Sequence, residues 1–232
     1  MEKIQEYALH MDWDMAFEGK SRGNRHLFRV NQLAKYLQKM EGGDRDVIIA
    51  AAWLHDIGLV HGNANHCFKG AKMARNFLGE LGIDYDTIMR IVHCIEAHDG
   101  EIEARSLEAK VVHDADTLDK MGPLGIVRQT WKLLVLNAYT VEELLDVLPS
   151  HLQKRRDNLY LYSSVALADR HALIVRDFFE DRAGAARVLH YIGKLAKNGL
   201  PTENVVESMR NEGLLTEEFS NALEEQLLLT FL

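Results

Sequence analysis

An adjacent histidine and aspartate, His55 and Asp56, close an apolar run that has no polar face. The run spans residues 47–54, and as a helix it would be buried on all sides. A buried carboxylate has to be paired, hydrogen-bonded or bound to a metal, because an unpartnered buried charge is too costly. Since neutral imidazole and carboxylate both bind divalent metals, the pair either closes a core helix through a hydrogen bond or belongs to a metal centre.

Other histidines of the first half could join this pair. Seven of the eleven histidines fall between residues 26 and 113. His26 extends the buried stripe of its predicted helix, with Arg29 beside it. His66 begins another helix, and His98 flanks the apolar face of a third. His93 projects to the polar side of that third helix, so we do not expect it to be a ligand.

Three aspartates, Asp114, Asp116 and Asp119, share about a turn and a half of one predicted helix. They repel one another unless a cation or a basic partner compensates them. The apolar stripe slightly favours Asp114 as the more buried acid, and periodicity does not decide which aspartate is a ligand. Oxygen and nitrogen ligands from separate helices could converge in a helical domain, and such sets suit Mn, Fe, Ni, Co or Zn, with Mg also compatible.

Apolar residues recur at helical spacing throughout the chain, and no proline precedes Pro123. We see no strand pattern and predict an all-α fold. Asp44 is the expected N-cap of the helix that carries the apolar run. Start and stop signals predict helices at 25–40, 45–58, 66–81, 85–98, 107–121, 125–137, 141–147, 158–180, 184–198, 202–211 and 216–231, with Pro149, Gly184, Pro201 and Gly213 between those of the second half.

We expect a helical domain over residues 1–180 and a C-terminal helical extension over residues 181–232, packed on the same domain. The last helix is rich in leucine and ends in Phe231 and Leu232. This apolar end needs a cover, which would be either the domain itself or a second copy of the chain in a homodimer.

The bulk properties of the chain exclude several classes of protein. A chain of 232 residues, 47% hydrophobic and 27% charged, can bury a sizeable core. A net charge of −8 argues against nucleic-acid binding through general basicity, although a local phosphate pocket stays possible. Since we find no membrane-length segment, no signal peptide and only two cysteines, we expect a cytoplasmic protein without a membrane partner.

The order of these residues resembles the H…HD…D signature of the HD-domain metal-dependent phosphohydrolases. It is most similar to a small bacterial branch with H-x-x-R-V, L-H-D-I-G and D-A-D-x-L-D motifs, here at residues 26–30, 54–58 and 114–119. The likeness extends over residues 20 to 180 or so and implies an HD-domain helical bundle. It implies a metal-ligand set of His26, His55, Asp56 and Asp116, and so favours Asp116 over Asp114.

The resemblance also implies roles for further residues. His66 and His98 match positions that bind a second metal or contact the phosphate in family members with more histidines. For a metal-dependent hydrolase, we expect Asp56 to bridge two metals or, at a one-metal site, to orient the attacking water. We expect Arg29, which lies beside His26 on the same helix face, to contact the substrate phosphate. Weaker candidates for substrate binding are Lys69, Lys72 and Arg128.

The main functional hypothesis is a metal-dependent hydrolase that cleaves a phosphoester or phosphoanhydride of a nucleotide or another small phosphorylated metabolite. A first alternative keeps the fold and uses two irons for oxygenation, with His66 and His98 as additional ligands. A second alternative is a non-catalytic regulatory module with a structural metal, in which the C-terminal extension is an interaction surface.

Overall fold

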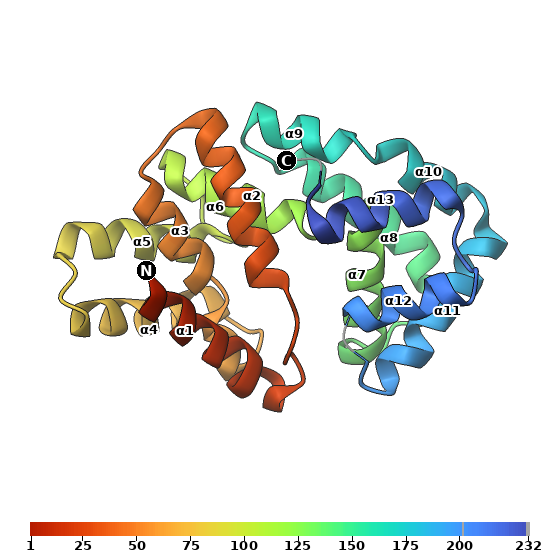
Figure 1. Ribbon diagram of the computed structural model, residues 1–232, viewed down its shortest axis with the longest axis horizontal. Coiled ribbons are helices and arrows are strands. Elements are labelled where there is room, and N and C mark those ends of the chain that lie inside the picture. The colour runs from red at the N-terminus through yellow and green to blue at the C-terminus, as the bar shows by residue number, and fades with distance from the viewer. Residues whose placement is uncertain (201, 231–232) are drawn as a thin grey trace. The chain divides into compact units, whose positions relative to one another are not determined.

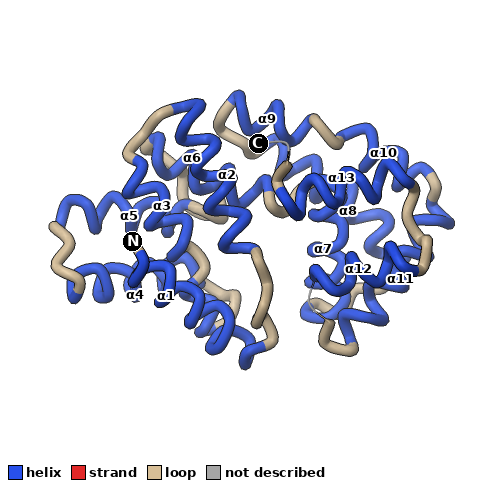
Figure 2. The backbone as a smooth tube through the Cα atoms, viewed as in Figure 1, coloured by secondary structure: helices blue, strands red, loops and turns tan. Residues whose placement is uncertain are grey.

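The computed structural model describes residues 1–200 and 202–230. Within these two ranges every regular element is a helix and there is no strand (Figure 2). The predicted all-α fold is confirmed. In the same ranges no single helix is long and apolar enough to cross a bilayer, although residues 45–61 and 66–80 reach that length and hydropathy as a pair bent by 116°.

The chain divides into two compact units. The first comprises residues 1–117 and 160–164, and the second comprises residues 118–159 and 165–232. The expected boundary at residue 180 does not coincide with this division, because helices on both sides of residue 180 contribute to one apolar core. A separate role for residues 181–232 stays a prediction.

The first unit begins with α1 (Glu2–His10), a π-helical turn η1 (Met11–Met15) and a 3-10 turn η2 (Ala16–Gly19). There follow α2 (His26–Glu41), α3 (Arg45–Leu54), the 3-10 helix η3 (Ile57–His61), α4 (His66–Glu80), α5 (Tyr85–Ala97) and α6 (Leu107–Leu118), whose last residue belongs to the second unit (Figure 1).

Helix α3 is the central element of the first unit. All its residues from Val47 to Leu54 are buried, as the apolar run without a polar face predicts. Helices α1, α2 and α5 pack against it. The Asp44 side chain accepts hydrogen bonds from the backbone N–H groups of Asp46 and Val47, which confirms Asp44 as the N-cap.

Helix α1 is an element that we did not predict. Its buried side chains are only Ile4 and Ala8, which lie one turn apart on the side that meets α3. Tyr7 stacks on Phe77 of α4 with a ring-centroid distance of 3.9 Å. A single apolar pair at helical spacing is too short a pattern to identify, so tertiary packing defines this helix.

The second unit contains α7 (Gly122–Leu136), α8 (Val141–Asp157), most of α9 (Tyr162–Asp169), α10 (Ala172–Glu180), α11 (Arg182–Lys197), α12 (Thr202–Asn211) and α13 (Glu217–Leu228). Helix α7 packs against α8, α11 and α13. The core between them is built from aliphatic and aromatic side chains, including Leu144, Leu148, Leu189, Ile192 and Leu223.

Two predicted boundaries in this unit are wrong. Pro149 does not end a helix at residue 147, because it lies inside α8 and the following half of that helix buries Leu152. Proline removes one backbone hydrogen bond, and here the added core contact outweighs that loss. The predicted helix over 158–180 is two helices, α9 and α10, separated by a break at Arg170 and His171.

The C-terminal prediction extends past the described chain. Helix α13 ends at Leu228, and Leu229 takes a left-handed conformation with φ 52°. Pro201, Phe231 and Leu232 lie outside the described residues, so the structure does not test what covers the apolar end.

Candidate metal centre

The end of α3 presents His55 and Asp56 side by side, and both are buried. The His55 Nδ1 lies 3.0 Å from the carbonyl oxygen of Ala52. Because a carbonyl can only accept, Nδ1 carries the proton and the Nε2 of the neutral ring presents a lone pair to the site.

Four side chains from α2, α3, α6 and the turn after α3 form a first group. The Nε2 of His26 lies 3.3 Å from the Nε2 of His55. The Oδ2 of Asp56 is 3.4 Å from both nitrogens. The Oδ1 of Asp116 lies 3.2 Å from the His26 Nε2 and 3.6 Å from the His55 Nε2. The residues expected to be metal ligands therefore meet at one point.

A second histidine pair faces the other oxygen of Asp56. The Nε2 atoms of His66 and His98 lie 3.2 Å apart. The Asp56 Oδ1 is 3.5 Å from the His66 Nε2 and 3.4 Å from the His98 Nε2. Each ring directs Nδ1 to a backbone carbonyl, that of Asn63 at 3.0 Å and that of Ile95 at 2.7 Å. These bonds leave both Nε2 atoms turned toward Asp56.

Two glycines bring the second pair close to the first group. A Cβ atom on Gly58, at the start of η3, would lie 2.0 Å from the carbonyl oxygen of His66 and 2.6 Å from the backbone nitrogen of Gly70. Helices η3 and α4 thus touch backbone to backbone, which only glycine permits. This contact sets the start of α4, and with it His66, beside Asp56.

The aspartates of α6 differ in their partners. Asp114 and Asp116 are both buried, with exposures of 0% and 1%. The Asp114 carboxylate accepts hydrogen bonds from the backbone N–H of Tyr160 at 3.1 Å and of Leu161 at 2.9 Å, and its Oδ1 lies 2.9 Å from His113 Nδ1. Asp114 therefore fixes the segment that returns to the first unit, whereas Asp116 faces the histidines.

Asp119 and Arg128 belong together in the second unit. The Arg128 guanidinium donates to the carboxylate of Asp119 and, at 3.0 Å, to its backbone carbonyl. Since Arg128 already makes these bonds, its expected role in substrate binding is a weaker hypothesis.

The remaining basic candidates lie in different surroundings. Arg29 is buried on α2, one turn after His26. The Lys69 ammonium group donates to the carbonyl oxygens of His61 and Ala64, at 3.1 and 2.8 Å, and so holds the loop before α4. Lys72 is exposed on α4. A contact of any of them with a substrate stays a prediction.

The electrostatics of the cluster favour bound positive charge. Burial would lower the pKa of His55, but Asp56 and Asp116 raise it to about 10. Burial would raise the pKa of Asp56, yet its histidine neighbours hold it well below the usual range. The pKa of His66 is raised by Asp56 against the effect of burial, while burial lowers the pKa of His98.

These donors fit divalent cations. Bonds of about 2.0–2.1 Å at octahedral or tetrahedral angles place neighbouring ligand atoms about 3 to 3.4 Å apart. The separations around Asp56 Oδ2 and around Asp56 Oδ1 lie close to that range. Facing imidazole lone pairs need a cation or a proton between them, and nitrogen–carboxylate sets suit Mn, Fe, Co, Ni or Zn.

One neighbour of the cluster was missed by sequence reasoning. The Sγ of Cys67 lies 3.6 Å from the Nε2 of His66, and the thiol is buried. Burial and the carboxylate of Asp99 raise the pKa of this thiol. The adjacency of Cys67 to His66 in the sequence is the signal that could have pointed to it. His93, which we did not expect to be a ligand, instead accepts a hydrogen bond from the Arg105 backbone N–H.

Comparison with known proteins finds a family match over the region that contains this cluster. The sequence profile of the HD domain matches residues 24–121. Curated relatives include ribonuclease Y of Thermobifida fusca, 30% identical over 132 residues, which are 56% of this chain and 25% of that protein. Ribonuclease Y of Acidothermus cellulolyticus is 32% identical over 52% of this chain and 23% of its own length. The chain thus spans about a quarter of the length of these relatives.

Solved structures share the fold over most of the chain. An HD-superfamily hydrolase from Bacillus thuringiensis is 25% identical, with a TM-score of 0.60 over 79% of this chain and 96% of that one. YpgQ from Bacillus subtilis, crystallised in complex with ADP, is 21% identical, with a TM-score of 0.60 over 77% of this chain and 93% of that one. A predicted HD-superfamily hydrolase from an uncultured Thermotogales bacterium is 21% identical, with a TM-score of 0.56 over 80% and 92% of the two chains.

Proposed function

We propose that this chain, which belongs to the HD-domain superfamily, is a metal-dependent phosphohydrolase that cleaves a phosphoester or phosphoanhydride of a nucleotide or another small phosphorylated metabolite. The observation that carries this proposal is the position of Asp56. Its Oδ2 faces His26 and His55, and its Oδ1 faces His66 and His98. A carboxylate that offers one oxygen to each of two imidazole pairs is suited to bridge two divalent ions.

Divalent ions at this cluster would lower the pKa of a bound water and polarise the phosphoryl oxygens of a substrate. The chain itself supplies the orientation of the ligands. The Nδ1–H groups of His55, His66 and His98 donate to backbone carbonyls, which fixes each tautomer and the direction of each Nε2 lone pair. Asp116 adds a buried carboxylate oxygen to the first histidine pair.

Arg29 is our candidate for binding the substrate phosphate. A guanidinium group matches a phosphate with two parallel hydrogen bonds, and Arg29 follows His26 by one turn of α2. Lys69 and Arg128 are secondary candidates, since an isolated basic residue most often has a structural or solvated role. Lys72 is a secondary candidate too, since an exposed lysine is most often a solvated group.

Charge and likeness support a small nucleotide as the substrate. The net charge of −8 disfavours a long polyanion such as RNA. YpgQ, which shares the fold, was crystallised with ADP. Because the curated relatives are named ribonuclease Y, RNA is the alternative substrate to test beside small nucleotides. This chain spans only about a quarter of the length of those relatives.

The test is a hydrolysis screen on protein purified without chelator, with Mn²⁺ added and nucleoside mono-, di- and triphosphates and a single-stranded RNA as substrates. We expect phosphate or pyrophosphate release from at least one nucleotide, and a loss of at least about 100-fold in His55→Ala, since even removal of a residue that only orients a ligand costs 10- to 100-fold. His190→Ala, which changes an exposed histidine of α11, is the matched control and should keep the wild-type rate.

Two outcomes would contradict the proposal. One is a His55→Ala protein that hydrolyses the nucleotide at the wild-type rate. The other is iron-dependent oxygen uptake without release of phosphate from any substrate of the screen. If only the RNA is cleaved, the proposal of a metal-dependent hydrolase stands, and the proposal of a small phosphorylated substrate is overturned.

A further inference from the structure

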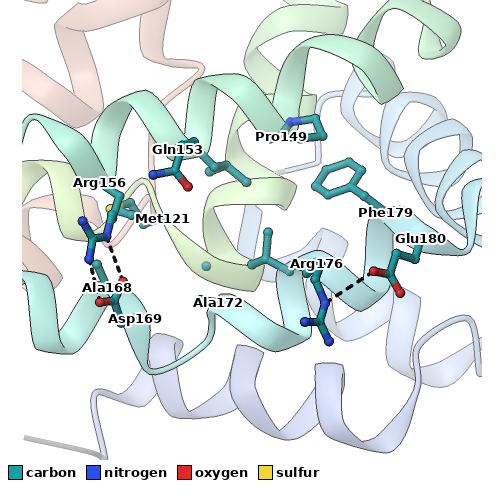
Figure 3. Close-up of a pocket in the computed structure, with 13 residues that line it drawn as sticks. Met121, Pro149, Gln153, Arg156, Ala168, Asp169, Ala172, Arg176, Phe179 and Glu180 are labelled. Carbon is teal, nitrogen blue, oxygen red and sulfur yellow. Dashed lines mark hydrogen bonds and ion pairs between the residues drawn. The ribbon is translucent and has the colours of Figure 1, made fainter.

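The second unit holds a pocket of about 400 Å³ between α8, α9 and α10 (Figure 3). Its 13 lining residues include no histidine, cysteine, serine or threonine. It therefore lacks the imidazole ligands that the cluster around Asp56 provides. This lining is suited to bind a ligand and not to catalyse a reaction.

The charged groups of the pocket are already neutralised. The guanidinium of Arg156 donates to both carboxylate oxygens of Asp169, at 2.9 and 2.8 Å. The guanidinium of Arg176 donates to a carboxylate oxygen of Asp177 at 3.1 and 2.8 Å, and its Nε lies 3.4 Å from a carboxylate oxygen of Glu180. Figure 3 shows both pairs at the wall of the pocket. An anion or a cation would have to compete with one of these internal partners, whereas an uncharged molecule leaves both pairs intact.

The rest of the lining is mainly apolar. Met121, Leu152, Val175 and the ring of Phe179 line the pocket together with Pro149. Ligand sites are typically apolar concavities with a few polar groups and volumes of about 300 to 1,000 Å³, and this pocket lies at the lower end of that range. An aromatic ring in such a wall favours a ligand that is itself a ring.

One uncharged polar side chain completes the lining. The amide nitrogen of Gln153 donates to Asp157 at 2.8 Å, and among the described residues the Gln153 side chain has no further hydrogen-bond partner. Its amide oxygen can therefore accept one hydrogen bond from a ligand. The lining thus offers one directional contact beside a large apolar surface.

We propose that this pocket is a second binding site, which takes an uncharged, largely apolar ring compound with one hydrogen-bond donor. The proposal does not depend on the chemistry assigned to the first unit, because all the residues that line the pocket belong to the second.

The test uses the full-length protein and the uncharged fluorescent probe N-phenyl-1-naphthylamine, which has a fused ring system and a single N–H. We expect saturable binding to the wild-type chain. The anionic analogue 8-anilinonaphthalene-1-sulfonate should bind at least about tenfold more weakly, a difference of about 1.4 kcal/mol.

Two substitutions from different helices fill the pocket. Ala172→Phe places a ring on α10 and Gln153→Phe places a ring on α8. Both residues line the pocket, and both are exposed. Each should weaken binding of the uncharged probe at least about tenfold. The matched control is Ala166→Phe, which adds the same ring at an exposed position of α9 that does not line the pocket, and it should bind as the wild type does.

Circular dichroism and thermal unfolding of all three variants identify any that fail to fold, and two pocket variants keep the test decisive if one does. The proposal is overturned if the wild-type chain does not bind the uncharged probe. It is also overturned if the folded pocket variants bind as well as Ala166→Phe, or if the sulfonate binds as tightly as the uncharged probe.

Discussion

In the first unit, buried histidines and aspartates face one another, and Asp56 lies within 3.5 Å of four imidazole nitrogens. In the second unit, the buried polar side chains of the described residues are scattered rather than gathered at one point, and Gln226 bonds to nearby backbone groups. Gln226 joins the Leu124 N–H and the Met121 carbonyl at 2.8 and 3.0 Å. The core around it is aliphatic and aromatic.

This difference separates the requirements of chemistry from those of stability. Grouping titratable side chains in a dry site raises the free energy of the fold unless cations or protons compensate them. The first unit contains such a group of side chains around Asp56, whereas the described core of the second unit is apolar. We therefore expect substitutions of the side chains that face Asp56 to change metal content, and substitutions in the apolar core of the second unit to change stability.

The largest expected effect is on the stability of the second unit. Leu189 is fully buried in its core, and Leu189→Ala should lower the free energy of unfolding by about 2–5 kcal/mol, because it removes apolar contacts and leaves a cavity. Urea denaturation measures this loss. Metal content per folded molecule should not change, and Leu173→Ala, at a residue 64% exposed, should cost less than about 0.5 kcal/mol. A loss of metal in folded Leu189→Ala would break the distinction between the units.

A second comparison lies within one helix. Asp116→Ala should weaken metal binding at least about 100-fold, because it removes an oxygen that faces two imidazoles. Asp114→Ala should keep the metal and lower the free energy of unfolding by about 1–3 kcal/mol, since the N–H groups of Tyr160 and Leu161 lose their acceptor. Isothermal titration with Mn²⁺ and denaturation measure the two quantities. Loss of metal binding in Asp114→Ala, with metal retained in Asp116→Ala, would contradict the roles given to these two aspartates.

A glycine pair tests the backbone contact that positions His66. Gly58→Ala should lower the free energy of unfolding by about 1–3 kcal/mol, because the new methyl group meets the His66 carbonyl. It should also reduce metal occupancy at the second histidine pair. Gly79→Ala, on the same helix as His66 but with no neighbour within 4 Å of the added carbon, should be neutral or stabilising by up to about 1 kcal/mol. Equal destabilisation by both substitutions would contradict the contact.

The smallest effect concerns pH and the second unit. Burial lowers the pKa of His171 below its value in the unfolded chain, while Glu225 beside it has a pKa lowered by the hydrogen bond with His171. In both cases the unfolded chain binds protons more readily than the folded chain. The contribution of these two groups to the free energy of unfolding is therefore complete at neutral pH. The His171 part is lost as the pH falls below about 6.5, and the Glu225 part as it falls toward about 4. Between pH 7.5 and pH 5, the midpoint temperature of thermal unfolding should fall less steeply in His171→Asn than in the wild type. A steeper fall in the variant would reverse the assigned sign.

Local sequence patterns predicted the elements that carry the site. The run without a polar face identifies α3 as a core helix, and Asp44 marks its start. The position of His26 on the stripe of α2 and the place of His98 after α5 follow from helical periodicity. The order of these motifs, matched to a known family, favoured Asp116 over Asp114 as a metal ligand, and this choice stays a prediction.

Long-range contacts account for what could not be predicted. The role of Asp114 depends on Tyr160, which lies 46 residues away, so no local pattern contains it. The place of His66 beside Asp56 depends on the backbone contact between Gly58 and the start of α4. Pro149 misleads because the core contact of Leu152 keeps α8 helical beyond it.

The most direct test of the metal centre is anomalous X-ray scattering from crystals of this chain grown with Mn²⁺. We predict two peaks about 3.5–4 Å apart, one beside His26 and His55 and the other beside His66 and His98, with Asp56 between them. A map with no peak at either pair, or with a single peak that Asp56 does not contact, would contradict the account.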